Sequence, residues 1–144
     1  MPAKTVRSSE APIIAVIDDD EAVREALSDL LQVLGLACRT FDRAEAFMAE
    51  YQPDRFDCLI TDVSMPGRSG LELQERLREL GSSMPVIVIT ADTSAATRAR
   101  ALSGGALACL TKPVKDDVLL RHLESALNRT GRARDDRRGT PSDE

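Results

Sequence analysis

The chain has 144 residues and a formal net charge of −5, with 42% hydrophobic and 30% charged residues, as expected for one globular domain. No apolar run approaches the ~18 residues of a membrane span, and the polar start MPAKTVRSSE lacks the apolar block of a secretory signal. We therefore expect a cytoplasmic protein without a membrane partner. The acidic balance and the 3% of aromatic residues argue against nucleic-acid binding by the folded part.

The first half of the chain alternates between short apolar segments and segments of helical periodicity. APIIAVI (11–17) predicts a buried strand, and apolar residues at helical spacing over 23–34 predict a helix that Gly35 ends. LACRTF (36–41) alternates weakly as a second strand. Apolar residues at i, i+3, i+4 and i+7 then predict a helix over 44–51.

The second half continues the alternation. Its predicted strands are CLIT (58–61), PVIVIT (85–90) and ALACL (106–110), and its predicted helices are one ended by Gly81, an Ala-rich one at 94–103 and a last one at 115–128. The Ala-rich helix has little apolar bulk to anchor it, which is typical of a mobile element.

Five strand–helix pairs in one chain predict an α/β fold. Strands that are apolar throughout indicate a parallel sheet covered on both faces, and right-handed crossovers make it doubly wound. We assign the domain to residues 11–128, a disordered N-terminal tail to 1–10, and a disordered charged tail or the start of a linker to 129–144. In such folds, ligands bind at the carboxyl ends of the strands.

The three cysteines do not indicate a metal site. Cys38, Cys58 and Cys109 are widely spaced, form no CxxC pair and lie in apolar segments, so we expect buried structural thiols. The single histidine, His122, falls on a polar-faced helix, where a solvated position is expected. Histidine-based catalysis therefore has little support.

The hydrophilic outliers all fall at the carboxyl end of a predicted strand. They are Asp18, Asp19, Asp62, Thr90 and Lys112. Three converging carboxylates require a hard cation, and Mg²⁺ suits them because it takes oxygen ligands and keeps several waters. A cation held there, together with the lysine charge and the threonine hydroxyl, would suit phosphoryl transfer, which we therefore predict for this edge of the sheet.

An aspartate is the expected nucleophile, because no serine, cysteine or histidine stands at these strand ends. Asp62 is the better candidate for the resulting acyl phosphate, since it stands alone while Asp18 and Asp19 form a pair. Asp20 and Glu21 are expected instead at the N-terminus of the first helix, whose dipole favours negative charge.

The segments VIDDDE, LITDVSMPGRSGLEL, VIVITA and LTKP resemble the signature segments of bacterial two-component response-regulator receiver domains. The segment RAEAF and the overall spacing are most similar to receivers that precede LuxR-type output domains. The resemblance covers residues 11–128 and implies the flavodoxin-like receiver fold, with strand order 2-1-3-4-5.

The resemblance also implies a role for each site residue. Asp62 accepts a phosphoryl group, Lys112 pairs with Asp62 and then with that group, and the Thr90 hydroxyl and the Ala91 amide bind it. The resemblance gives Mg²⁺ the following ligands: Asp19, Asp62 and the main-chain oxygen of Ser64, with Asp18 acting mainly through a water.

The implied partners are a sensor histidine kinase or a histidine phosphotransfer protein. Phosphorylation is expected to switch the face made by the fourth helix, fifth strand and fifth helix, for a downstream protein or a homodimer. Such a protein is not an enzyme in the ordinary sense, because it catalyses only its own phosphorylation and dephosphorylation.

Two positions stand out within this resemblance. Family members usually carry an aromatic residue where this chain has Cys109, so the usual coupling of that ring to the threonine cannot operate, and we expect a small thiol packed there. Asp92, two residues after Thr90, occupies a position that often tunes dephosphorylation, and we hypothesise that it shapes water access or partner choice.

Two other functions fit the sequence less well. An aspartate-dependent, Mg²⁺-requiring phosphohydrolase needs a general acid two residues after its nucleophile, where this chain has Ser64, and a cap for which the chain leaves no room. A pseudo-receiver that binds partners without phosphorylation is disfavoured by the complete set of site residues. The output stays open between a stand-alone receiver and a fragment of a longer regulator.

Overall fold

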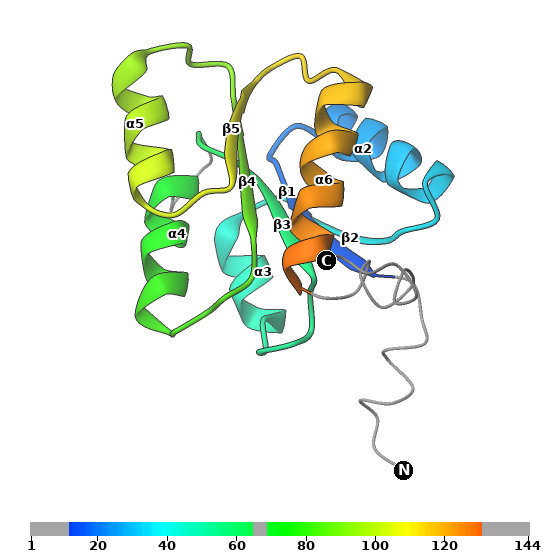
Figure 1. Cartoon of the computed structure of the whole chain (residues 1–144), viewed down its shortest axis with the longest axis horizontal. Coiled ribbons are helices and arrows are strands. Elements are labelled where there is room, and N and C mark those ends of the chain that lie inside the picture. Colours follow the sequence, from blue (N-terminus) through cyan, green and yellow to red (C-terminus); the bar gives the residue numbers. More distant parts are fainter. Residues whose placement is uncertain (1–11, 65–68, 131–144) are drawn as a thin grey trace, which may run out of the picture.

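The computed structural model describes residues 12–64 and 69–130, in which five strands alternate with five helices (Figure 1). In chain order the elements are β1 (Ile13–Ile17), α2 (Glu21–Val33), β2 (Ala37–Phe41), α3 (Ala44–Glu50), β3 (Cys58–Asp62), α4 (Gly70–Glu79), β4 (Val86–Thr90), α5 (Ala95–Ser103), β5 (Ala108–Thr111) and α6 (Asp116–Thr130). The predicted α/β alternation is confirmed. The tail predicted at 1–10, and the C-terminal tail beyond Thr130, lie outside the described residues.

The strands form one parallel sheet in the order β2-β1-β3-β4-β5, as expected for the flavodoxin-like receiver fold. Every side chain of β3 and β4 is buried, because both faces of these central strands are covered. β2 lies at one edge and is mostly exposed, which explains why its sequence alternates only weakly.

Helices cover both faces of the sheet. In Figure 1, α2 and α6 lie on one side of the sheet, and α3, α4 and α5 lie on the other. Alternate residues of β1 therefore enter different cores: Ala15 and Ile17 pack on the side of α3 and α4, whereas Ile14 and Val16 pack on the side of α2 and α6. Strands in this position have to be apolar at every residue.

Helix ends follow the predicted signals with small shifts. Gly35 and Gly81 come just after α2 and α4 with φ of +82° and +77°, a conformation that residues with a Cβ seldom adopt. α6 continues to Thr130, two residues past its predicted end. Among the described residues, no helix combines the length and apolarity that crossing a bilayer requires.

The fifth strand begins later than predicted, at Ala108 rather than at residue 106. The backbone N–H of Ala106 donates to the Ala101 carbonyl of α5 at 3.0 Å, so it is not available for pairing with β4. The strand ends at Thr111, and the following Lys112–Pro113 peptide bond is cis.

The cysteines are free, and two of them are buried as predicted, Cys58 in β3 and Cys109 in β5. Burial, together with the charge of nearby Asp57, raises the pKa of the Cys58 thiol to about 12 and keeps it protonated. Cys38 is only half-buried. His122 is also half-buried, on α6.

Candidate functional site

The polar residues predicted at the strand ends occupy one edge of the sheet. Asp62 is the last residue of β3 and Thr90 the last of β4, while Asp18 and Lys112 directly follow β1 and β5. Parallel strands present their carboxyl ends at one edge, so these four residues converge although they are distant in sequence. The backbone N–H of Lys112 also donates to the Thr90 carbonyl at 2.8 Å.

Three carboxylates meet at this edge. Oxygen atoms of Asp18, Asp19 and Asp62 lie within 4.8 Å of one another. Asp18 is fully buried and Asp62 is 4% exposed, whereas Asp19 is open to solvent. At an effective dielectric near 20, two such charges repel by roughly 3 kcal/mol, so the cluster needs compensating positive charge.

Lys112 supplies part of that charge and contacts two of the three carboxylates. Its Nζ donates to Asp62 Oδ2 at 3.2 Å and lies 2.9 Å from Asp18 Oδ2. The pairing with Asp62 was expected, but the shorter contact with Asp18 was not. In the sheet, β3 and β4 separate β1 from β5, so Lys112 reaches Asp18 through its long side chain and not through strand pairing.

The ionisation of the pair reflects this crowding. Burial and the charge of Asp18 raise the pKa of Asp62, while Lys112 and the backbone N–H of Ser64 oppose the rise. For Lys112, burial acts to lower the pKa, but the contact with Asp18 and the two carboxylate charges outweigh it and raise the pKa. Lys112 is therefore a cation at neutral pH.

The donor set fits a hard divalent cation. Asp18 Oδ1 accepts the backbone N–H of Asp20 at 2.9 Å, whereas the completely buried Asp18 Oδ2 has the Lys112 ammonium beside it, at 2.9 Å. A buried carboxylate oxygen whose cationic partner is shared with Asp62 is incompletely compensated. An oxygen-seeking cation or its bound water at this point would satisfy that atom.

Of the groups predicted to bind the phosphoryl group or the metal ion near Asp62, Thr90 has a hydrogen bond in the structure, and Ser64 and Ala91 are described by their position and exposure. Thr90 is 3% exposed, and its Oγ1 accepts the backbone N–H of Asp92 at 2.9 Å. Ser64 and Ala91 are exposed and follow the ends of β3 and β4. The roles of the Ser64 main-chain oxygen and of the Ala91 amide stay predictions.

The second part of the acidic run at the end of β1 lies at a helix N-terminus, as predicted. Asp20 is the N-cap of α2, and its Oδ1 accepts the Ala22 N–H at 2.9 Å, while Glu21 is the first residue of that helix. One contact here was not predicted: Arg24 Nη1 donates to the Asp18 carbonyl at 2.7 Å. An arginine six residues after the aspartate carries no sequence signal for such a bond.

The start of α4 also contributes to the site through Gly70, which the sequence reasoning missed. Its N–H donates to the Val63 carbonyl at 2.9 Å, and a Cβ on Gly70 would lie 2.1 Å from the Asp62 carbonyl oxygen. Only glycine permits this approach. Ser69 and Glu72 form a reciprocal capping box at the same end, a pattern that was visible in SGLE.

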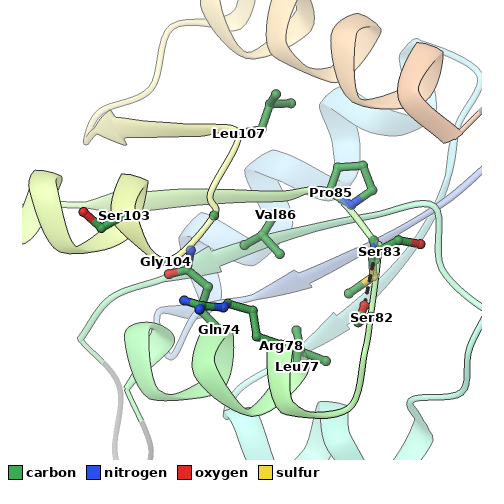
Figure 2. A pocket seen from close by; sticks show the side chains of 12 residues that line it. Gln74, Leu77, Arg78, Ser82, Ser83, Pro85, Val86, Ser103, Gly104 and Leu107 are labelled. Carbon is green, nitrogen blue, oxygen red and sulfur yellow. Dashed lines mark hydrogen bonds between the residues drawn. The ribbon is translucent and has the colours of Figure 1, made fainter.

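A separate cavity of about 320 Å³ lies between the end of α4, the end of α5 and the starts of β4 and β5. Figure 2 shows Gln74 and Arg78 of α4 lining it opposite Ser103 and Gly104. No carboxylate lines this cavity, and it adjoins the starts of the strands. The chemistry described above is therefore not located there.

Comparison with known proteins agrees with this geometry. The family model for the response regulator receiver domain matches residues 14–124. Response regulator protein TodT of Pseudomonas putida is 38% identical over 120 residues, which are 83% of this chain and 53% of that protein. Transcriptional regulatory protein FixJ of Bradyrhizobium diazoefficiens is 38% identical over 114 residues, 79% of this chain and 56% of that protein.

The solved structures agree as well. The structure of response regulator StyR is 37% identical, with a TM-score of 0.79, and the match covers 90% of this chain and 65% of that one. The chain spans about half the length of the curated relatives that it matches. From the matched residues, the sheet order and the identity to these regulators, the chain belongs to the family of response regulator receiver domains.

Proposed function

We propose that the chain is the phosphoacceptor of a two-component signalling system, in which Asp62 takes a phosphoryl group from a sensor histidine kinase or a histidine phosphotransfer protein. The observation that carries this proposal is the position of Asp62, buried at the end of β3 beside Lys112 and two further carboxylates. The cytoplasmic location expected from the sequence is part of the same proposal.

The side chains support an in-line transfer to Asp62. A carboxylate oxygen of Asp62 attacks the phosphorus, the bond to the donor's histidine nitrogen breaks, and its electron pair stays on that nitrogen. Lys112, cationic and 3.2 Å from Asp62, balances the charge that arrives. The Thr90 hydroxyl and the Ala91 amide are the proposed donors to the phosphoryl oxygens.

Mg²⁺ is the proposed cofactor of this transfer. Asp19, Asp62 and the main-chain oxygen of Ser64 would hold the ion, with Asp18 acting through a water. When bound, the ion supplies positive charge to the phosphoryl oxygens. The three clustered carboxylates, which share the single ammonium of Lys112 between Asp18 and Asp62, support this assignment.

We propose that phosphorylation changes the face made by α5, β5 and α6 and thereby controls which partner binds there. A downstream protein or a second copy of the chain is the proposed partner, and the only reactions of the receiver are its own phosphorylation and dephosphorylation. The likeness to LuxR-type receivers stays a prediction. A stand-alone receiver and a part of a longer regulator are both compatible with this output.

Acetyl phosphate with Mg²⁺, or a beryllofluoride mimic, tests the proposal directly. We expect one adduct per chain by intact-mass spectrometry, and we expect Asp62→Asn to abolish it. Asp20→Asn is the matched control, because the same substitution at the helix cap leaves the site carboxylates in place and Asn caps helices as well as Asp.

Other outcomes of this experiment would identify the competing functions. Absence of an adduct in the wild type would contradict the proposal and favour a pseudo-receiver that binds partners without phosphorylation. Turnover of phosphate esters would favour an aspartate-dependent phosphohydrolase, which the family match and Ser64 at the general-acid position both disfavour.

A further inference from the structure

Helix α5 is held against the rest of the domain mainly by hydrogen bonds. Of its nine residues, only Ala101 is buried. A helix that buries one methyl group gains little from the hydrophobic effect, so its position depends on a few polar contacts. The contacts at its two ends differ in what they connect.

Two contacts of the helix do not involve the candidate site residues. Gln74 Nε2 donates to the Ala101 carbonyl at 2.8 Å from the neighbouring α4, and Figure 2 shows Gln74 reaching toward the Gly104 end of α5. Arg98 Nη1 donates to the Cys109 carbonyl of β5, also at 2.8 Å. These two bonds fasten α5 to its neighbours.

The contacts at the N-terminal end form a continuous chain that starts at Thr90. The Asp92 N–H donates to Thr90 Oγ1 at 2.9 Å. The Asp92 carboxylate then accepts the Ser94 N–H at 2.8 Å through Oδ1 and the Thr97 hydroxyl at 2.7 Å through Oδ2. Ser94 caps the helix, because its Oγ accepts the Thr97 N–H at 3.2 Å.

Asp92 therefore joins two groups through one residue. Its backbone holds the hydroxyl of a buried threonine at the edge where Asp62 and Lys112 lie, and its side chain holds the first turn of α5. N–H···O hydrogen bonds span about 2.7–3.2 Å between donor and acceptor, so a displacement of the Thr90 hydroxyl by about 1 Å away from Asp92 has to move residues 92–94 or break the link.

We propose that Asp92 is a positioning residue that couples the Thr90 hydroxyl to the N-terminal turn of α5. The proposal rests on the proposed function, in which Thr90 binds the incoming phosphoryl group. In the unphosphorylated protein, the Asp92 link holds α5 in the position seen here. When the Thr90 hydroxyl turns to the phosphoryl group, the link to Asp92 is strained or lost, and the first turn of α5 loosens.

Amide hydrogen exchange at Thr97 and Arg98, followed by NMR with and without acetyl phosphate and Mg²⁺, tests the coupling. Phosphoryl uptake is measured by mass spectrometry on the same samples. Asp92→Ala removes both side-chain bonds, and Thr97→Val removes the hydroxyl at nearly constant volume. Asp92→Asn, which keeps an acceptor for Ser94 and a partner for Thr97, should restore most of the wild-type behaviour.

Thr93→Val is the matched control, since Thr93 is an exposed threonine in the same loop and no hydrogen bond of its side chain is seen among the described residues. We expect phosphorylation to speed exchange at these amides in the wild type and in Thr93→Val. In Asp92→Ala and Thr97→Val, exchange should already be about fivefold faster before phosphorylation, and the further increase should fall to less than half.

The ratio of exchange rates with and without phosphorylation separates coupling from a merely structural role. A structural role would speed exchange equally in both states and leave the ratio at its wild-type value, which would overturn the proposal. Phosphoryl uptake by the wild type without any change at α5 would also overturn it. Absence of uptake would instead contradict the proposed function, and the coupling would fall with it.

Discussion

Asp18 and Asp19 are neighbours in the chain but lie in opposite environments. Asp18 is fully buried, with one oxygen bonded to the Asp20 N–H and the other beside Lys112, whereas Asp19 is exposed. An exposed carboxylate keeps waters and can exchange them for a cation, while a buried one is better placed to act at fixed geometry. The same run then provides the cap of α2 through Asp20.

This division predicts different effects for neighbouring substitutions. Asp19→Asn should lower Mg²⁺-dependent phosphorylation by acetyl phosphate at least about tenfold, because it removes a proposed ligand of the ion. Asp20→Ala should cost about 1 kcal/mol of unfolding free energy through the lost cap, with phosphorylation retained. Mass spectrometry and urea unfolding measure the two effects. Equal loss of phosphorylation in both variants would contradict the division.

At the level of elements, the start of α4 fixes how closely that helix approaches β3. Gly70 lies against the Asp62 backbone, and the Ser69–Glu72 capping box ends the turn that follows Asp62. The carbonyl that a Cβ would strike belongs to the backbone of a buried strand, so it has little freedom to move. Local geometry at Asp62 thus depends on a residue eight positions later.

Gly70→Ala is therefore expected to destabilise the domain by about 1–3 kcal/mol or more, as overpacked cores do. It should also slow phosphorylation, since the Asp62 backbone must shift. Gly104→Ala is the matched control, because there an added Cβ would come no nearer than 3.0 Å to another atom, the side-chain amide nitrogen of Gln74. Thermal unfolding by circular dichroism compares the two. If Gly104→Ala were the more destabilised of the two, the close approach of Gly70 to the Asp62 carbonyl would not be what prevents a larger residue there.

At the level of the whole molecule, the site is a source of instability that the proposed cation would relieve. Burial and the charge of Asp18 raise the pKa of Asp62. Compared with the unfolded chain, the folded state therefore disfavours the ionised form of Asp62 relative to its protonated form. Ionised Asp62 therefore costs stability at neutral pH. This cost disappears as the pH falls through the raised pKa toward the ordinary value of 3.8.

Without divalent cations at pH 7, Asp62→Asn should consequently have a higher Tm than the wild type, and the difference should shrink as the pH is lowered toward that of an ordinary aspartate. Mg²⁺ should raise the Tm of the wild type and leave that of Asp62→Asn nearly unchanged, because a ligand stabilises only the state that binds it. Differential scanning calorimetry with EDTA or Mg²⁺ measures both. A less stable Asp62→Asn variant under EDTA would contradict the proposed cost.

Much of the fold and of the site was predictable because both depend on local patterns. Five apolar segments separated by helical periodicity predict the alternation, and the edge location of Asp62 and Thr90 follows from parallel strands alone. Element ends were less predictable. The start of β5 moved to Ala108 because α5 uses the N–H of Ala106, a competition that no strand pattern reveals.

Patterns in the sequence were enough to predict the α/β architecture, the polar residues at one edge of the sheet, and the resemblance to receiver domains. The contacts between distant side chains became known only from the folded chain: Lys112 contacts Asp18 as well as Asp62, Gly70 lies against the Asp62 backbone, and Asp92 bridges to Thr97. The two kinds of information differ in their range along the chain. Hydrophobic periodicity is a property of neighbours in the chain, whereas contacts of 3 Å between side chains depend on strand order, register and loop path, which only the folded chain defines.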